Sequence, residues 1–149
     1  MGARAGLTGG CQCGAVRYRL EGEPTGASVC YCRMCQKASG GPFMAFAGVR
    51  LAELVFTRGA PKTFVSSSAA ERGFCAACGT PLTYRLFDRD RISFTIGSLD
   101  DPGALAPAIQ YGVESKPPWV ESIFGLPERD IAIYIAANVG SRQHPDHDD

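Results

Sequence analysis

Seven cysteines in three tight clusters are the feature that most constrains this chain of 149 residues. They occur, in chain order, at Cys11, Cys13, Cys30, Cys32, Cys35, Cys75 and Cys78. Their number is odd, and residues 1–10 contain no apolar stretch of the kind that a secretory signal needs. A disulfide framework is therefore disfavoured, and the clustering indicates metal ligation or thiol redox chemistry.

The first and third clusters have spacings that suit chelation of one metal ion. Residues two apart in a strand point to the same face, so Cys11 and Cys13 can lean toward the roughly 3.8 Å that separates two sulfurs on tetrahedral zinc. Cys75 and Cys78 form a Cys-x-x-Cys turn in which Gly79 tolerates positive φ. A redox dithiol would be expected in a βαβ pattern, which this sequence lacks. The four thiolates together could close one structural zinc site.

The second cluster has three thiolates within six residues, at Cys30, Cys32 and Cys35. Three ligands leave one tetrahedral position open, and catalytic zinc sites hold water or substrate there. Spacing does not force this partition, because Cys11 and Cys13 could share an ion with part of the second cluster. Loop closure favours that shorter connection by only about 1 kcal/mol. A second closed structural site is the alternative. Either partition predicts two zinc ions per chain.

Short runs of strand-forming residues separated by Gly and Pro predict a mainly β fold. The expected strands are residues 15–20, 42–49, 54–57, 63–66, 82–87 and 92–96, of which the last two form a hairpin. Residues 32–39 are expected to form one short turn or helix. Both histidines, His144 and His147, lie in a polar C-terminal segment that predicts a flexible tail rather than a source of zinc ligands.

Composition limits the classes of partner. Hydrophobic residues make up 45% of the chain and charged residues 20%, which is typical of a globular domain. Fifteen basic side chains balance fifteen acidic ones, and this zero net charge argues against nucleic-acid binding. No apolar run reaches the ~18 residues that a membrane helix needs. We therefore expect a cytoplasmic single-domain protein, without a membrane or nucleic-acid partner, that acts on small molecules.

Four blocks of the sequence resemble the glutathione-dependent formaldehyde-activating enzyme family, which includes centromere protein V. The blocks are GGCQCGAVRY at 9–18, CYCRMCQK at 30–37, FCAACGTPL at 74–82 and SKPPWV at 115–120. The resemblance runs from residue 9 to about residue 127. It implies a β-tent fold of packed short antiparallel sheets, like the Mss-four guanine-exchange chaperone. It also implies a lead at 1–8, one zinc-binding domain at 9–140 and a flexible polar tail at 141–149.

The resemblance further implies how the cysteines divide. Cys11, Cys13, Cys75 and Cys78 would hold a structural zinc ion, and Cys30, Cys32 and Cys35 would hold a catalytic one. The named reaction of the family joins glutathione to formaldehyde and yields S-(hydroxymethyl)glutathione, which makes the expected activity that of a carbon–sulfur lyase. Glutathione would be the co-substrate, and the other partners are small thiols and aldehydes.

Some residues outside the cysteines are candidates for the same site. Arg33 and Lys37 could pair with the carboxylates of glutathione, and Trp119 could line a substrate pocket or simply pack. Family members commonly have a His and an apolar residue about nine positions before the Trp, whereas this chain has Gln110 and Tyr111. Gln110 is also a candidate to close the second cluster. The alternative function is a non-catalytic module with two structural zinc ions that docks a protein partner.

Overall fold

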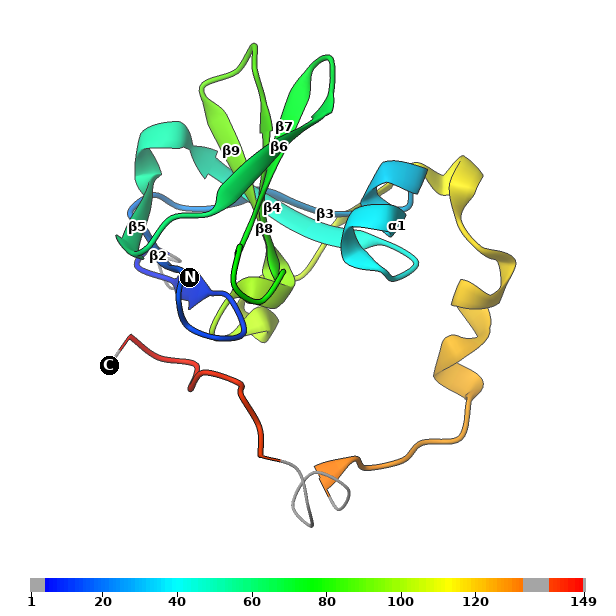
Figure 1. Ribbon diagram of the computed structural model, residues 1–149. Helices are drawn as coiled ribbons and strands as arrows, with labels where there is room; N and C mark the ends of the chain where they lie inside the picture. Colours follow the sequence, from blue (N-terminus) through cyan, green and yellow to red (C-terminus); the bar gives the residue numbers. More distant parts are fainter. Residues whose placement is uncertain (1–4, 133–139, 149) are drawn as a thin grey trace.

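Two β-sheets form the body of the molecule in the computed structural model, which describes residues 5–132 and 140–148 (Figure 1). The strands are β1 (Thr8–Gly10), β2 (Arg17–Leu20), β3 (Thr25–Cys30), β4 (Met44–Arg50), β5 (Leu54–Arg58), β6 (Lys62–Ser67), β7 (Ala70–Phe74), β8 (Pro81–Leu86), β9 (Arg91–Thr95) and β10 (Ile109–Tyr111). The small sheet has the order β1-β2-β5, and the large sheet has the order β10-β3-β4-β9-β8-β7-β6. The expected mainly β fold is confirmed.

One α-helix and several 3₁₀ turns complete the described structure. The helix α1 (Arg33–Ser39) follows β3, and it ends at Gly40, whose φ of 70° suits a residue without a side chain. The 3₁₀ turns are η1 (Leu51–Glu53), η2 (Ile96–Ser98), η3 (Pro102–Ala104), η4 (Val113–Ser115) and η5 (Pro118–Gly125). In the part of the chain that is described, no helix is long and apolar enough to cross a membrane.

The hydrophobic core lies between the two sheets. Tyr18 and Leu20 of the small sheet are fully buried, and they meet Val49, Leu82 and Phe94 of the large sheet in one cluster. Along β2 the exposed Arg19 separates Tyr18 from Leu20, as a half-buried strand requires. The Tyr18 and Phe94 rings lie 6.1 Å apart, and the Tyr18 hydroxyl lies 2.7 Å from Ser98 Oγ. The buried phenol thus keeps a polar partner.

All the strands expected from the sequence are present, with ends that differ by a few residues. The expected hairpin is confirmed by the antiparallel pairing of β8 with β9. Four strands were not expected, namely β1, β3, β7 and β10. β3 and β7 contain Gly, Ser or charged residues, and β1 and β10 have only three residues each, so their pairing in the sheets outweighs weak local signals. The β10–β3 pair is parallel, which departs from the expected antiparallel arrangement.

A buried ion pair joins the small sheet to the segment that follows η2. Arg17 is 3% exposed, and its two terminal nitrogens donate to the two carboxylate oxygens of Asp100 at 2.7 and 2.6 Å. Burial alone would raise the pKa of Asp100, but hydrogen bonds from Arg17 and Thr8 hold it below the usual value for an aspartate. The ionised pair therefore contributes stability at neutral pH.

Replacing Asp100 with asparagine should lower the free energy of unfolding by about 2 kcal/mol at pH 7, because the buried Arg17 would keep only one carboxylate partner, the more exposed Asp148. The contribution of Asp100 is complete above its unfolded pKa of about 3.9 and is lost as the pH falls through its lower folded pKa. The variant and the parent protein should therefore converge in strong acid. Denaturant unfolding at several pH values measures this difference. Asp88→Asn, at an exposed turn, is the control and should change little.

Candidate metal centres

Four sulfurs from two distant segments meet at one end of the core. Cys11 and Cys13 belong to the loop after β1, and Cys75 and Cys78 belong to the turn after β7. Cys11 Sγ lies 3.6 Å from Cys13 Sγ, and Cys13 Sγ lies 3.9 Å from Cys75 Sγ. All four sulfurs lie within 4.8 Å of one another. We call this group the four-cysteine cluster.

Local backbone geometry brings the sulfurs of each pair together. In the turn after β7, the Gly79 N–H donates to the Cys75 carbonyl at 2.8 Å, and Gly79 has a φ of 81°. In the loop after β1, Gly14 has a φ of 77°, and the Val16 N–H donates to Cys11 Sγ at 3.2 Å. Glycine at both bends permits left-handed backbone that other residues rarely adopt.

The two cysteines of the turn after β7 differ in acidity. Burial raises the pKa of the Cys75 thiol. Burial would also raise the pKa of Cys78, but the Thr80 hydroxyl, 3.2 Å from its sulfur, and nearby backbone N–H groups lower it to about 6. Cys78 is therefore predominantly a thiolate at neutral pH, which is the form that binds a metal.

The second group of sulfurs comes from one short segment at the junction of β3 and α1. Cys30 ends β3, Cys32 is the N-cap of α1, and Cys35 lies in the first turn of the helix. The Cys35 N–H donates to Cys32 Sγ at 3.4 Å, so the cap itself orients one sulfur. The three sulfurs lie within 4.8 Å of one another. We call this group the three-cysteine cluster.

A buried arginine lies against the three-cysteine cluster. Arg72 of β7 is 5% exposed, and its Nη2 donates to Cys35 Sγ at 3.4 Å. Its Nε donates to Ser66 Oγ at 2.9 Å, and its guanidinium lies 4.9 Å from the centre of the Tyr84 ring. Among the described residues no carboxylate pairs with it. A buried cation needs a compensating anion, and the thiolates of this cluster are the nearest source.

The cluster cysteines also differ in acidity. Burial raises the pKa of Cys35 to about 12, even though the hydrogen bond from Arg72 opposes this shift. Burial would raise the pKa of Cys32 as well, but hydrogen bonds from the backbone N–H of Cys35 and from neighbouring groups leave it below the usual value. The capping position therefore favours one thiolate before any cation is bound.

Both clusters fit zinc in donor type and in spacing. Thiolate sulfur is a preferred ligand of zinc, and tetrahedral geometry places sulfurs about 3.8 Å apart, close to the separations in the four-cysteine cluster. That cluster offers four protein ligands and closes the tetrahedron. Within residues 5–132 and 140–148, no histidine, aspartate or glutamate joins the three sulfurs of the other cluster. Its three sulfurs are one fewer than the four ligands of tetrahedral zinc.

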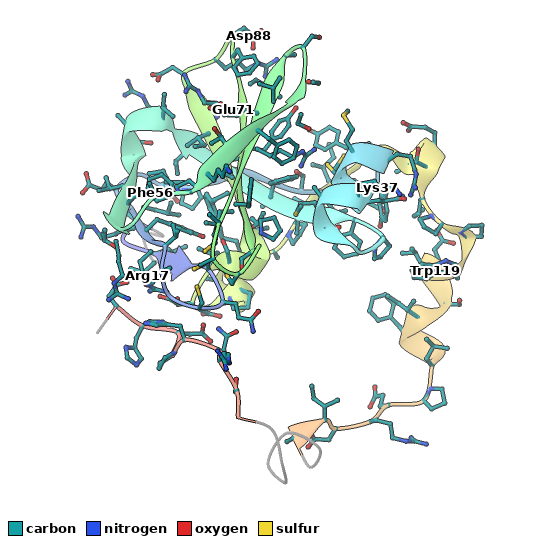
Figure 2. All side chains as sticks on the ribbon, viewed as in Figure 1. Arg17, Lys37, Phe56, Glu71, Asp88 and Trp119 are labelled. Atoms are coloured by element: carbon teal, nitrogen blue, oxygen red, sulfur yellow. The ribbon has the colours of Figure 1, made fainter. Side chains whose placement is uncertain are left out.

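The predicted glutathione-binding residues lie on the exposed side of α1. Arg33 and Lys37 line a cavity of about 490 Å³ together with Pro117 and Trp119. The Arg33 guanidinium also donates to the side chain of Gln36, whose own amide bonds the Tyr31 and Ser115 carbonyls. Figure 2 shows Lys37 on α1 and Trp119 on the segment that leads away from the sheets. The structure thus brings together the cations and the tryptophan that the sequence singled out.

Gln110 lies on the edge strand β10, which pairs with β3. Its side-chain oxygen accepts a hydrogen bond from the Tyr31 hydroxyl at 3.0 Å. Tyr31 lies between Cys30 and Cys32 in the sequence, and its N–H donates to the carbonyl of Tyr111 at 2.9 Å. Gln110 therefore supports the residue that separates two of the sulfurs.

The C-terminal segment 140–148 contacts the loop of the four-cysteine cluster. The His144 N–H donates to the Gln12 carbonyl at 2.7 Å, and the His144 ring packs over Gly14 so closely that a Cβ there would lie 2.2 Å from it. Asp148 pairs with Arg17 at 2.6 Å. In the portion of the chain that is described, neither His144 nor His147 belongs to a sulfur cluster.

Sequence reasoning missed Arg72 and Tyr84. Arg72 lies on the same face of β7 as Ala70 and Phe74. An arginine at this spacing from two apolar residues was the one indication in the sequence that its side chain is buried. Because the composition of residues 70–74 did not predict a strand, the spacing of Arg72 could not be recognised as a strand pattern. Only the pairing of β7 with β8 places Arg72 over Tyr84 and against Cys35.

Comparisons with known proteins identify the family of this chain. The sequence model of the glutathione-dependent formaldehyde-activating enzymes matches residues 6–115, and the chain belongs to that family. A Halomonas elongata protein whose name assigns it provisionally to these enzymes is 32% identical over 150 residues, which cover 87% of this chain and 94% of that protein. An uncharacterized lyase of Schizosaccharomyces pombe is 36% identical over 76 residues, which cover 51% of this chain and 55% of the lyase.

A solved structure supports the fold. The crystal structure of a Rhodobacter sphaeroides protein from a structural-genomics programme aligns with a TM-score of 0.56 and 22% identity. The alignment covers 69% of this chain and 98% of that protein. At this identity the likeness concerns the arrangement of strands, and it assigns no chemistry.

The two clusters should respond differently to the loss of one ligand. We expect two zinc ions per purified chain. Cys75→Ser should release one ion and lower the midpoint of thermal unfolding by about 10 °C or more, since zinc binding to a structural site is folding energy. Cys30→Ser should release the other ion and change the midpoint by only about 3 °C. Metal analysis and thermal melts measure both effects. Equal destabilisation by the two variants would make both sites structural.

Proposed function

We propose that this protein is a zinc-dependent carbon–sulfur lyase that joins a thiol to an aldehyde, with glutathione and formaldehyde as the reference pair. The family to which the chain belongs is named for that pair, and one relative is named as a lyase. The observation that carries the proposal is the three-cysteine cluster, whose sulfurs converge within 4.8 Å without a fourth side-chain ligand among the described residues. A structural site would be expected to close its tetrahedron.

The residues that would hold the metal are Cys30, Cys32 and Cys35. Zinc bound there would supply a Lewis acid that favours the deprotonated form of a thiol in the open position. The positive charge of Arg72 at Cys35 offsets the negative charge of three thiolates in a buried setting. The cap contact from the Cys35 N–H to Cys32 Sγ holds the local backbone in its ligating conformation.

Charged groups of the protein position the thiol substrate. Arg33 and Lys37 on the exposed side of α1 can pair with the two carboxylates of glutathione, and Trp119 provides an apolar wall of the same cavity. Both cations lie within a few residues of Cys35, so a peptide held by them has its sulfur close to the cluster. Such positioning makes the encounter with the aldehyde effectively intramolecular.

The reaction is an addition without oxidation or reduction. The thiol sulfur forms a bond to the carbonyl carbon, the carbon–oxygen double bond becomes a single bond, and the proton of the thiol is transferred to the oxygen. The product from formaldehyde is S-(hydroxymethyl)glutathione. The reverse reaction returns both substrates, which places the activity among the lyases.

Replacing Cys32 with serine should lower the protein-dependent rate of adduct formation at least about 100-fold, since a lost ligand weakens metal binding and distorts the site. The circular dichroism spectrum should remain that of the parent protein. Exchange NMR of glutathione with formaldehyde measures the rate above the uncatalysed background. Met34→Leu, which removes an exposed sulfur from the same helix, is the matched control and should leave the rate unchanged.

The alternative is a non-catalytic module with two structural zinc ions that docks a protein partner. It predicts no protein-dependent adduct formation from glutathione and formaldehyde. It also predicts that glutathione leaves the coordination of both ions unchanged. X-ray absorption at the zinc edge, with and without glutathione, separates the two functions, because a bound substrate thiol adds a fourth sulfur to one site only.

A further inference from the structure

A second cavity lies on the other side of Lys37, between α1 and the large sheet. Its volume is about 410 Å³, and it is lined from α1 by Lys37 and Ala38 and from the sheet by residues of β4, β6, β7, β8 and β9. Figure 2 shows α1, with the labelled Lys37, beside these strands. Formaldehyde has only two heavy atoms, whereas cavities of this volume accommodate molecules many times larger. The size of the cavity therefore does not match formaldehyde.

The cavity is apolar over much of its wall. Its apolar lining residues are Ala38, Met44, Phe46, Phe64, Phe74 and Pro81. The Phe64 and Phe74 rings lie 6.0 Å apart in an edge-on arrangement, and Phe64 is 49% exposed at the entrance. Among the described residues no aspartate or glutamate lines the cavity. The ammonium group of glutathione would therefore have no carboxylate partner among these lining residues.

Two cations give the cavity its charge. Arg72 lines the wall, and its Nη1 has no hydrogen-bond partner among the described residues, although Nε and Nη2 are both engaged. Lys37 at the edge forms no ion pair with a described residue. A free donor on a buried guanidinium and a neighbouring ammonium group favour an anion. The cavity thus combines an apolar body with two cationic groups, Lys37 and Arg72.

The cavity adjoins the three-cysteine cluster. Met44 and Phe46 line the cavity and also pack with Cys35 in one buried group. Arg72 contacts Cys35 Sγ from the cavity wall. A molecule held in the cavity therefore lies against side chains that pack directly on the sulfur cluster. The glutathione cavity lies on the exposed side of α1, and Lys37 borders both cavities.

We propose that this cavity binds the electrophile, and that the electrophile is an aldehyde with an apolar body and a carboxylate group that pairs with Lys37, which leaves the free Nη1 of Arg72, beside Cys35, for the carbonyl oxygen. This inference rests on the proposed function, because it takes the three-cysteine cluster as the place where thiol and aldehyde meet. The addition balances as it does for formaldehyde: the carbon–sulfur bond forms, the carbonyl double bond becomes single, and the thiol proton goes to the carbonyl oxygen. The carboxylate and the apolar body do not react and serve only to bind.

Direct binding tests the cavity without relying on activity. Isothermal titration of the zinc-loaded protein with benzoate should show binding at least about tenfold tighter than with acetate, which lacks the ring. It should also be about tenfold tighter than with benzyl alcohol, which lacks the charge. Equal binding of benzoate and acetate would overturn the inference. It would show that the carboxylate binds at the metal and that the ring does not occupy the cavity.

Variants at exposed positions locate the binding without risk to the core. Phe64→Ala should weaken benzoate binding about fivefold or more, since it removes an aromatic wall. Phe87→Ala is the matched control, because Phe87 is 47% exposed and lies outside the cavity. Lys37→Gln should weaken benzoate but not benzyl alcohol, and Arg89→Gln, on the distant turn after β8, should affect neither. Unchanged benzoate binding in Phe64→Ala and Lys37→Gln would overturn the assignment.

A substrate comparison separates this inference from the proposed function. The protein should accelerate the addition of glutathione to 4-formylbenzoate more than its addition to benzaldehyde, and Phe64→Ala should reduce that preference. Acceleration with formaldehyde, without benzoate binding or a preference for 4-formylbenzoate, would overturn this inference alone. Benzoate binding without acceleration of any aldehyde would overturn the proposed lyase function and the role of the cavity in it.

Discussion

The contact between the loop after β1 and the turn after β7 is the constraint on which the arrangement of the site depends. Four sulfurs meet there, and Cys13 and Cys75 are separated by 62 positions in the sequence. The turn that contains Cys75 and Cys78 connects β7 to β8. β7 contains Arg72, which contacts Cys35. The strand that leads into the four-cysteine cluster thus also contains the cation that contacts the three-cysteine cluster. The closed set of ligands in the four-cysteine cluster suits a structural role.

The two clusters differ in how they are assembled. The four-cysteine cluster joins two distant segments, so its formation closes a long loop and depends on the folded core. The three-cysteine cluster comes from six consecutive residues at a strand–helix junction, and the N-cap geometry of Cys32 already orients one sulfur. A site assembled locally can exchange an external ligand without disturbing the sheets. This difference in assembly is consistent with a structural role for one cluster and chemistry at the other.

The helix α1 separates two cavities of contrasting character. On its exposed side Arg33 faces a polar cavity that Trp119 of η5 also lines, while the side that faces the sheet covers an apolar cavity whose wall includes Arg72. Lys37 borders both. Under the proposed function, two substrates of different chemistry would bind on opposite sides of one short helix. The family name concerns one aldehyde, whereas the size and lining of the second cavity favour a larger one.

The sequence by itself determined the mainly β class, the strands rich in branched and aromatic residues, and the cysteine spacings, because these depend on local preference and short-range geometry. It could not identify β7, whose Gly, Glu and Arg residues have weak strand preference, and so it could not place Arg72. It also left open which cysteines share a site, since loop entropy hardly distinguishes the partitions. The tertiary structure decided both points, because strand pairing across the large sheet fixes which distant side chains meet.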